Sequence, residues 1–435
     1  YLIPYFNFIN NYIKHYGIIY TIKVLKQMRL HCTRFICGHP LMDNKMSIGL
    51  DKDGWPKKLS FLKPLVVSNS LEEKKFLFTL LLFSRSLKLS EAEWNKVQPD
   101  YSTITNPSSC SYKIPSGFIN KFVDTFKLES KSGCLDFSKH NLYLSAKAGP
   151  NGPATLTALA NVTKLSYDEI IELGHLTDEE GKNFLIDQLN YALDNPDRVL
   201  SKLIFNPNDK SLDQVNLVNN YTGKLSFVKD PDAKLRIIAI VDYYTQLFLK
   251  PINDQLFKLI KQLPCDRTYT QDPRHSWLDN GENFYSLDLS SATDRFPIDL
   301  QKRLLTRIFR SQVVSEGWYK TLSCKLFWTG DDLVGPVRYS TGQPMGSYSS
   351  WISFTLAHHL VVHWCASLCG LDNFDQYIIL GDDIVIKNNK VAKKYIEVIQ
   401  AMGVEISLNK THVSSDTYEF AKRWIKGTKE LTGLP

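Results

Sequence analysis

The sequence lacks a long hydrophobic run, a cysteine framework and internal repeats. Its longest apolar stretch, residues 76–83, is far shorter than the roughly 20 residues that span a bilayer. The 8 cysteines are scattered without paired spacing, which favours a reducing compartment. The chain begins with Tyr1 rather than Met, so we expect a fragment of a longer product. No secretory signal peptide is visible, but in a fragment this carries little weight.

The composition predicts an ordinary globular protein. Hydrophobic residues make up 43% and charged residues 22% of the 435 residues, which argues against disorder and allows two or three domains. The formal net charge of +7 permits a nucleic-acid partner without requiring one, because a mild basic excess is common.

Residues 377–386 are the most informative stretch, because an apolar run leads into Gly381-Asp382-Asp383 and a β-branched run leads out. Two short strands that meet at a glycine predict a hairpin with both carboxylates at its tip. The flanks are apolar enough for burial on both faces. Adjacent carboxylates beside a core repel each other unless a cation neutralises them. A divalent metal site is therefore the leading interpretation, although a lone Gly-Asp-Asp also occurs by chance.

Two other clusters of metal-ligand residue types are better explained by packing. His31, Cys32, Cys37 and His39 lie within a short segment, but their spacing is tighter than that of paired zinc knuckles. The histidines within residues 358–363 lack the glutamate of the metalloprotease pattern. We expect core histidines there rather than ligands.

Residues 223–240 alternate like a β-hairpin with a turn at Pro231. Lys234 and Arg236 are two positions apart, so on a strand they project from the same face. Two cations on one face are costly unless they are solvated or matched to an anion such as a triphosphate. On local grounds alone, the solvated alternative is favoured.

Residues 284–297 carry a further pair of carboxylates. An apolar strand is expected to deliver Asp288 at its end, and small residues then turn the chain towards Asp294, near the start of a helix over residues 298–309. Asp294 could simply cap that helix. Asp288 has no such structural explanation.

A loop of small residues, 340–347, precedes a long helix that we expect to continue through Trp364. Such a loop lets backbone N–H groups approach a ligand closely. The Gly- and Pro-rich loop at residues 145–155 could contact phosphate in the same way, but a plain connector is equally expected.

The remaining elements follow from hydrophobic periodicity and turn signals. The first segment, residues 1–30, is compatible with a helix. Its cations Lys14, Lys23, Lys26 and Arg29 could line a nucleic-acid path, but we expect a solvated basic face. Further helices are expected over residues 70–100, 154–160, 167–192, 242–263 and 391–402, and a strand over residues 403–407.

The order of the motifs is far more specific than any one of them. The chain contains, in this order, a basic strand (228–239), an Asp-bearing strand (288–294), a glycine-rich loop (340–346), an Asp-Asp hairpin (381–383), a lysine segment (409–412) and an aromatic segment (420–424). In this order the sequence resembles the RNA-dependent RNA polymerases of positive-strand RNA viruses, most closely those of mitoviruses, with levivirus replicases as more distant relatives. Residues 148–152 also resemble a mitovirus element.

The resemblance implies template-directed RNA synthesis with two Mg²⁺ or Mn²⁺ ions. The metal ligands that it implies are Asp288, Asp382, Asp383 and the carbonyl of Leu289. It implies Lys410 as the general acid that protonates the leaving pyrophosphate.

The resemblance also implies where the ribonucleoside triphosphate binds. Asp294 would recognise the ribose 2′-hydroxyl, which many relatives do together with an Asn on the helix after the glycine-rich loop. This chain has serines there instead, so Ser340 and Ser349 are the candidate partners of Asp294. The residues implied to contact the nucleotide are Lys229, Lys234, Arg236, Asp294, Ser340, Gly342, Gln343 and Ser349.

The implied fold is α/β, a right-hand polymerase with a small antiparallel palm sheet, helical fingers and no thumb. Residues 1–282 would form the N-terminal region and fingers, with the triphosphate-binding strand at 224–240. Residues 283–435 would form the palm, with part of the fingers inserted around 312–338. RNA template and product strands are the implied partners, and the host mitochondrion is the implied location.

Two alternatives stay open. A reverse transcriptase shares the palm chemistry, but such enzymes usually carry a bulkier residue at the position of Gly381, and Asp294 suits a ribose. A truncated or host-integrated remnant would bind RNA without chemistry, although the intact carboxylates argue against decay.

Overall fold

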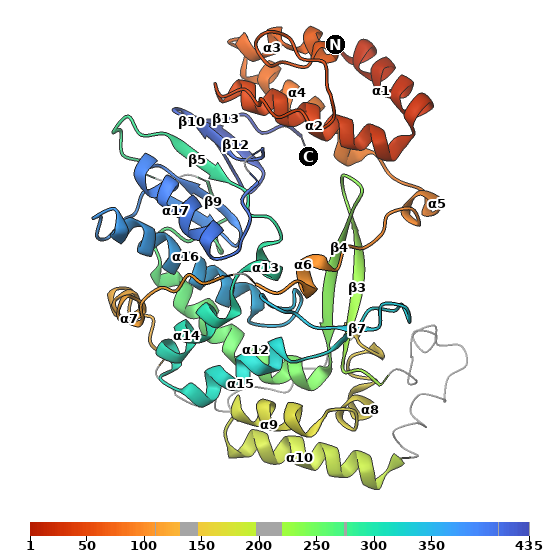
Figure 1. Cartoon of the computed structure of the whole chain (residues 1–435), viewed down its shortest axis with the longest axis vertical. Coiled ribbons are helices and arrows are strands. Elements are labelled where there is room, and N and C mark those ends of the chain that lie inside the picture. Colours follow the sequence, from red (N-terminus) through yellow and green to blue (C-terminus); the bar gives the residue numbers. More distant parts are fainter. Residues whose placement is uncertain (109, 131–146, 197–219, 274–275, 408, 435) are drawn as a thin grey trace.

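The structure is a computed structural model that describes residues 1–435 except 109, 131–146, 197–219, 274–275, 408 and 435. It is a mixed α/β structure with small sheets. Figure 1 shows the N-terminal helices across one end of the molecule and helices α9 and α10 at the other. Two sheets lie between these ends, and they position the residues of interest.

The helices of the described residues are α1 (Leu2–Tyr16), α2 (Ile18–Ile36), η1 (Lys57–Leu62), α3 (Pro64–Val67), α4 (Leu71–Leu81), η2 (Phe83–Ser86), α5 (Glu91–Trp94), α6 (Ser102–Thr105), α7 (Ser116–Thr125), α8 (Ala158–Val162), α9 (Tyr167–His175), α10 (Glu179–Asp194), α12 (Tyr243–Leu259), η5 (Ile260–Gln262), α13 (Ala292–Arg295), α14 (Ile298–Phe309), α15 (Gln312–Ser323), α16 (Ser350–Leu368) and α17 (Asn389–Ala401). The strands are β1 (Ala148–Gly149), β2 (Gly152–Pro153), β3 (Gly223–Asp230), β4 (Lys234–Val241), β5 (Phe284–Leu287), β6 (Phe327–Trp328), β7 (Pro336–Val337), β8 (Tyr377–Leu380), β9 (Asp383–Ile386), β10 (His412–Ser414), β11 (Thr417–Phe420), β12 (Arg423–Lys426) and β13 (Lys429–Glu430).

The first sheet has the strand order β10-β5-β9-β8, with antiparallel neighbours throughout. We call it the central sheet. The expected hairpin over residues 377–386 is confirmed as β8 and β9. Because side chains alternate along a strand, Ile379 and Ile384 pack into the large helical core, whereas Ile378 and Val385 pack on the opposite face. The expectation that both faces are buried is therefore confirmed.

Helices α16 and α17 contribute to the core on one face of the central sheet. The sheet formed by β11, β12 and β13 covers the other face, through a cluster that includes Tyr418, Phe420 and Ile425. Burial on both faces holds the β8–β9 turn at a rigid edge, which is what a precise site requires.

The second sheet has the order β4-β3-β6-β7. The expected hairpin is confirmed as β3 and β4, and β6 adds to β3 in parallel, with Lys224 opposite Trp328. Residues 312–338, expected as an insertion, thus include two strands of the same sheet as the basic hairpin. Figure 1 shows β3 and β4 rising from the helical base towards α2, opposite the central sheet.

Several expected boundaries are wrong for local reasons. The helix expected over residues 70–100 ends at Leu81, and the helix over 167–192 is divided in two at Asp178, whose side chain accepts a hydrogen bond from the N–H of Gly181. Residues 403–407 do not form a strand, because Ile406 makes only an isolated bridge. The loop expected at 145–155 contains β1 and β2, and its first two residues lie outside the described residues.

None of the described helices combines the length and the apolar character needed to cross a membrane.

Candidate active site

The tip of the β8–β9 hairpin is a turn that only glycine fits. Gly381 has a φ of +61°, and a Cβ there would lie 2.7 Å from Nε1 of Trp351. On the other side of the turn, Nδ1 of the buried His358 lies 2.8 Å from the carbonyl oxygen of Gly381, and Nε2 lies 2.6 Å from the hydroxyl of Tyr395. Burial lowers the pKa of His358 to about 3, so the neutral imidazole donates from Nδ1 and accepts from Tyr395.

The central sheet brings Asp288 to this turn. Strand β5 pairs with β9 so that Leu287 lies opposite Ile384, and continuing that register by one residue places Asp288 beside Asp383. Asp382 and Asp383 keep access to solvent, but the protein around them displaces water. This desolvation, with the charges of Asp382 and Asp288, raises the pKa of Asp383 to about 7. Desolvation also raises the pKa of Asp382, and the charge of Asp288 adds to that rise.

Lys410 supplies the nearest cation to this group. Its Nζ lies 2.9 Å from Oδ2 of Asp288. Leu289 is buried and pairs with Ile406 as an isolated bridge. In the described part of the chain, no three Asp, Glu, His or Cys side chains are already gathered closely enough for a metal ion. The carboxylates are adjacent, with Asp288 turned towards Lys410.

The cluster that contains His31 and Cys32 lies at the end of α2. Nε2 of His31 lies 3.3 Å from Nε2 of Gln27, inside the helix, and Cys32 is buried in the N-terminal core. These contacts are packing contacts. The histidines of α16 are also core residues: His359 bonds the hydroxyl of Tyr377 and the carboxylate of Asp266.

A cavity of about 360 Å³ opens in front of Asp288 and Asp383, and many of its other charged lining residues are cations. The sequence-based expectation for Lys26 and Arg29 is wrong, because both line this cavity and are half-buried instead of lying on a solvated face. The cationic lining residues are Lys26, Arg29, Arg85, Lys234, Arg236, Lys410 and Lys422.

Arg29 also closes one wall of this cavity. Its guanidinium lies 3.1 Å from Oδ2 of Asp232, at the β3–β4 turn, and Ser84 donates to the other oxygen of Asp232 at 2.8 Å. The N-terminal helices are thereby tied to the basic hairpin. Sequence patterns miss this contact because its partners are about 200 residues apart.

The three hairpin cations implied to bind the triphosphate lie in different surroundings. Lys234 and Arg236 are exposed and line the cavity, and Arg236 pairs with Asp230 at 2.6 Å. Lys229 is exposed and pairs with Glu91 at 2.6 Å, and it is absent from the cavity lining. The structure therefore brings two of the three cations to the carboxylates.

A further carboxylate, Glu419, lines the cavity as well. Desolvation raises its pKa to about 7, and the neighbouring charge of Asp383 contributes to the rise. Glu419 was missed because it precedes an aromatic segment with no acidic motif around it. Its position follows only from the packing of β11 against the central sheet.

The glycine-rich loop packs against α13. The N–H of Gly342 donates to the carbonyl of Asp294 at 3.0 Å, and a Cβ on Gly342 would lie 2.1 Å from the carbonyl oxygen of Thr293. Gln343 is fully buried, and its amide donates to the carbonyl of Ser350. Glycine is thus required for close approach of two backbones, and Gln343 supports the start of α16.

The interpretation of Asp294 as a cap of the helix over residues 298–309 is wrong, because Asp294 lies within α13 and Pro297 occupies the N-cap of α14. The expected hydrogen-bond partners are replaced by another residue. Oδ2 of Asp294 accepts a hydrogen bond of 2.8 Å from Oγ1 of Thr103 in α6.

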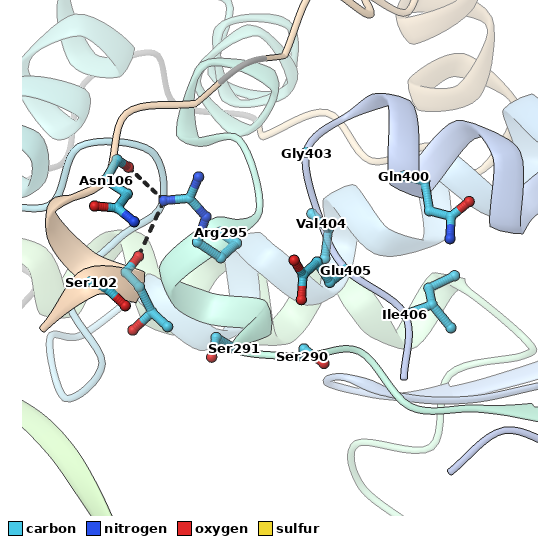
Figure 2. Close-up of a pocket in the computed structure, with 11 residues that line it drawn as sticks. Ser102, Asn106, Ser290, Ser291, Arg295, Gln400, Gly403, Val404, Glu405 and Ile406 are labelled. Atoms are coloured by element: carbon cyan, nitrogen blue, oxygen red, sulfur yellow. Dashed lines mark hydrogen bonds between the residues drawn. The ribbon is translucent and has the colours of Figure 1, made fainter. Parts of the chain in front are cut away.

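A second cavity, of about 680 Å³, lies beside α13. Figure 2 shows it between Arg295 and Asn106 on one side and residues 403–406 on the other. Thr103 lines this cavity, and Arg295 is its cationic lining residue, whereas the first cavity has several.

Comparison with known proteins gives related sequences. The RNA-directed RNA polymerase of Cryphonectria parasitica mitovirus 1 is 33% identical over 339 residues, which cover 76% of this chain and 40% of that protein. Two uncharacterized mitochondrial proteins of Arabidopsis thaliana are 35% identical over 157 residues (35% of this chain, 76% of that protein) and 38% identical over 182 residues (39% and 70%).

Among solved structures, the RNA-dependent RNA polymerase of a human picorbirnavirus aligns with a TM-score of 0.39 and 17% identity, over 47% of this chain and 43% of that chain. The chain spans 40% of the length of the mitovirus polymerase that it matches. The sequence model of the mitovirus RNA-dependent RNA polymerase family matches residues 135–435, which include both carboxylate-bearing segments. The chain therefore belongs to the mitovirus RNA-dependent RNA polymerase family.

Proposed function

We propose that this chain is an RNA-directed RNA polymerase that adds ribonucleotides to an RNA product strand on an RNA template, as part of viral genome replication. The observation that carries the proposal is the register of the central sheet, which sets Asp288 beside the Asp382-Asp383 turn at one end of a cation-lined cavity. Family membership supports the same activity.

The donor set suits a hard divalent cation. Carboxylate oxygens are the ligands that Mg²⁺ and Mn²⁺ prefer, and the carbonyl of Leu289 is a further oxygen at the end of β5. The raised pKa of Asp383 reflects repulsion and desolvation that a cation would relieve. A pair of bound Mg²⁺ or Mn²⁺ ions would lower the pKa of the attacking 3′-hydroxyl and stabilise charge on the triphosphate.

The chain's own cations would bind the triphosphate. Lys234 and Arg236 project from one side of the cavity, and Lys26 and Arg29 project from α2 on another. These charges offset the negative charge that develops on the leaving pyrophosphate. Arg236 and Arg29 are paired with Asp230 and Asp232, and would have to exchange these partners for the triphosphate. Lys229 would contribute only after release from Glu91, because it is paired outside the cavity.

Lys410 would donate the proton that the pyrophosphate needs. Its ammonium is paired with Asp288 and lines the same cavity as the carboxylates, which is where the triphosphate would bind. General acid catalysis of this kind contributes about 10²–10⁴-fold.

The right-hand architecture is part of the proposal. The central sheet with α16 and α17 would be the palm, and the β3–β4 hairpin with the N-terminal region would be fingers. Mitochondrial location is proposed from the relatives, which are a mitovirus protein and two mitochondrial proteins. RNA and ribonucleoside triphosphates are the proposed partners.

The turn supports RNA synthesis over reverse transcription. Reverse transcriptases usually carry a larger residue in the position of Gly381, and here Trp351 leaves no room for one. The half-buried Asp294 with its hydroxyl partner suits discrimination of ribose.

The decisive experiment measures incorporation of labelled ribonucleotides on a primed RNA template with Mg²⁺ or Mn²⁺. We expect incorporation by the purified chain, its loss with EDTA, and a fall of at least about 10³-fold in Asp382→Ala. Asp372→Ala is the matched control, because Asp372 is exposed and paired only with Lys121. Equal incorporation by the two variants would refute the proposal.

The same assay separates the alternatives. Preference for deoxyribonucleotides would identify a reverse transcriptase. RNA binding that weakens with salt, without incorporation under any condition, would identify a remnant that binds RNA only.

A further inference from the structure

Asp294 is held by a residue from a distant part of the chain. Thr103 lies 191 positions earlier, and its Oγ1 donates to Oδ2 of Asp294 at 2.8 Å. Across the residues that the structure describes, this is the side-chain hydrogen bond that Asp294 receives. Oδ1 of Asp294 therefore keeps its accepting capacity for another donor.

The serines expected as partners are engaged elsewhere. Ser349 is buried, its Oγ donates to the carbonyl of Tyr348, and it accepts from Nε1 of Trp318 at 2.8 Å. Ser340 donates from Oγ to the carbonyls of Ile104 and Asn106. Neither hydroxyl is directed at Asp294.

Thr103 is presented by a segment that is firmly anchored. Arg295, the neighbour of Asp294, donates to the carbonyls of Thr103 at 3.3 Å and Asn106 at 2.6 Å, and Figure 2 shows its guanidinium reaching Asn106. Ile104 is fully buried in the core of the β3–β4 sheet. Because the carbonyl of Thr103 is held by Arg295 and the next residue, Ile104, is buried, the hydroxyl of Thr103 is preorganised towards the carboxylate.

We propose that Thr103 is the positioning residue for ribose selection: its hydroxyl fixes one oxygen of Asp294, so that the other accepts the 2′-hydroxyl of the incoming nucleotide. Thr103 thus takes the place that an Asn on α16 has in many relatives. This inference rests on the proposed function, because it concerns the substrate preference of the same site.

The chemistry of the contact supports such a role. A carboxylate that is half-buried and unfixed can rotate or take up a proton, and either change removes an acceptor. Desolvation raises the pKa of Asp294, and the hydroxyl of Thr103 acts against that rise, as do Lys234 and Arg295. A 2′-deoxynucleotide offers no donor to Oδ1, so it gains nothing from the alignment.

The test compares three variants within the same short helix. Thr103→Val removes the hydroxyl and keeps the side-chain shape, and Thr103→Ser restores the donor. Thr105→Val is the matched control, because Thr105 is exposed and its hydroxyl donates to the carbonyl of Tyr101, the N-cap of the same helix. The readout is the ratio of kcat/KM for ATP to kcat/KM for 2′-deoxy-ATP on one template.

We expect the ratio to fall about tenfold in Thr103→Val, the scale of one hydrogen bond to a charged group. The fall should come from a lower kcat/KM for ATP, while kcat/KM for 2′-deoxy-ATP changes little. Thr103→Ser and Thr105→Val should keep the ratio of the unmodified chain. If Thr103 has a merely structural role, Thr103→Val would lower kcat/KM equally for both nucleotides and leave the ratio unchanged. That result would overturn the inference.

Equilibrium binding of the two nucleotides, with Ca²⁺ in place of Mg²⁺, gives the ratio of their Kd values. This ratio tests the same discrimination without turnover. Failure of the unmodified chain to bind or incorporate either nucleotide would overturn the proposed function and this inference together. Normal use of ATP with an unchanged ratio in Thr103→Val would overturn this inference alone.

Discussion

The indole ring of Trp351 lies against Gly381, so that a Cβ on the glycine would come within 2.7 Å of the ring nitrogen. Trp351 stacks in turn on Phe257, with ring centroids 6.0 Å apart. His358 fixes the carbonyl of the same glycine from inside the core. The position of Asp382 and Asp383 is therefore set by aromatic side chains of α12 and α16.

Gly381→Ala should damage both the fold and the chemistry. The positive φ and the contact with Trp351 cost about 1–3 kcal/mol, and a shift of the turn by about 1 Å costs about 10²-fold in turnover. Urea unfolding and ribonucleotide incorporation measure the two effects.

Gly370→Ala is the control for that substitution. Gly370 also has a positive φ, +75°, but no atom lies within 4 Å of its Cβ position. The Gly370→Ala variant should lose only about 1 kcal/mol of unfolding free energy and keep its activity. Equal loss of activity in both variants would show that the Trp351 contact is unimportant.

Lys410→Ala should lower kcat about 10²-fold with little loss of stability. Both side chains of the Lys410–Asp288 pair are 42% exposed, and such pairs contribute at most about 1 kcal/mol. We propose Lys410 as the proton donor to the leaving pyrophosphate, so its loss should slow the chemical step. Lys393→Ala, an exposed lysine of α17, should leave kcat and the unfolding midpoint unchanged. An unchanged kcat in Lys410→Ala would exclude the role as general acid.

Lys26→Ala should raise KM for the nucleotide about fivefold to tenfold, because one charge of the cavity is lost, on the scale of about 1 kcal/mol for a partly exposed ion pair. Lys23 lies on the exposed side of the same helix, so Lys23→Ala should behave like the unmodified chain. The difference should shrink as the salt concentration rises. Identical KM values for the two variants would mean that α2 does not contact the triphosphate.

Acid should destabilise the fold through its buried histidines. Burial lowers the pKa of His358 and of His412 to about 3, whereas the unfolded value is about 6.5. Between these values the unfolded chain binds more protons, so the free energy of unfolding falls as the pH is lowered from about 6.5 towards 3. Each histidine contributes up to about 1.4 kcal/mol per pH unit.

His412→Gln isolates one of these contributions. Asp383 and Glu419 act in the opposite direction, because their pKa values are raised to about 7 and their stabilising protons are lost as the pH rises from about 4 to 7. The difference between His412→Gln and the unmodified chain cancels that background. Urea midpoints should show a shallower acid slope in the variant, and parallel slopes would contradict a buried neutral His412.

The local elements could be predicted wherever a period and a turn agree. The hairpin over residues 377–386 and the helix over 298–309 lie where their patterns place them, because alternation and a glycine turn specify a hairpin without help from distant residues. The boundary at Asp178 was missed, because a single capping side chain, which accepts from the N–H of Gly181, starts a new helix without a change of hydrophobic period. The end of α4 at Leu81 was missed as well.

The candidate site was predictable only in part. Asp288, Asp382, Asp383 and Lys410 are marked by motif order, and the sheet brings the first three together. Lys234 and Arg236 were marked in the same way and line the cavity. Lys26 and Arg29 could not be assigned to the cavity from the sequence, because they resemble other cations of an amphipathic helix.

The amino-acid sequence by itself determined the family, the carboxylates and the strands that carry them, because these depend on residue type and local spacing. Tertiary structure alone decided which hydroxyl reaches Asp294 and which cations face the cavity. Contacts such as Thr103 to Asp294 and Arg29 to Asp232 join segments about 200 residues apart. Their geometry follows from how whole helices and sheets pack, which no local period records.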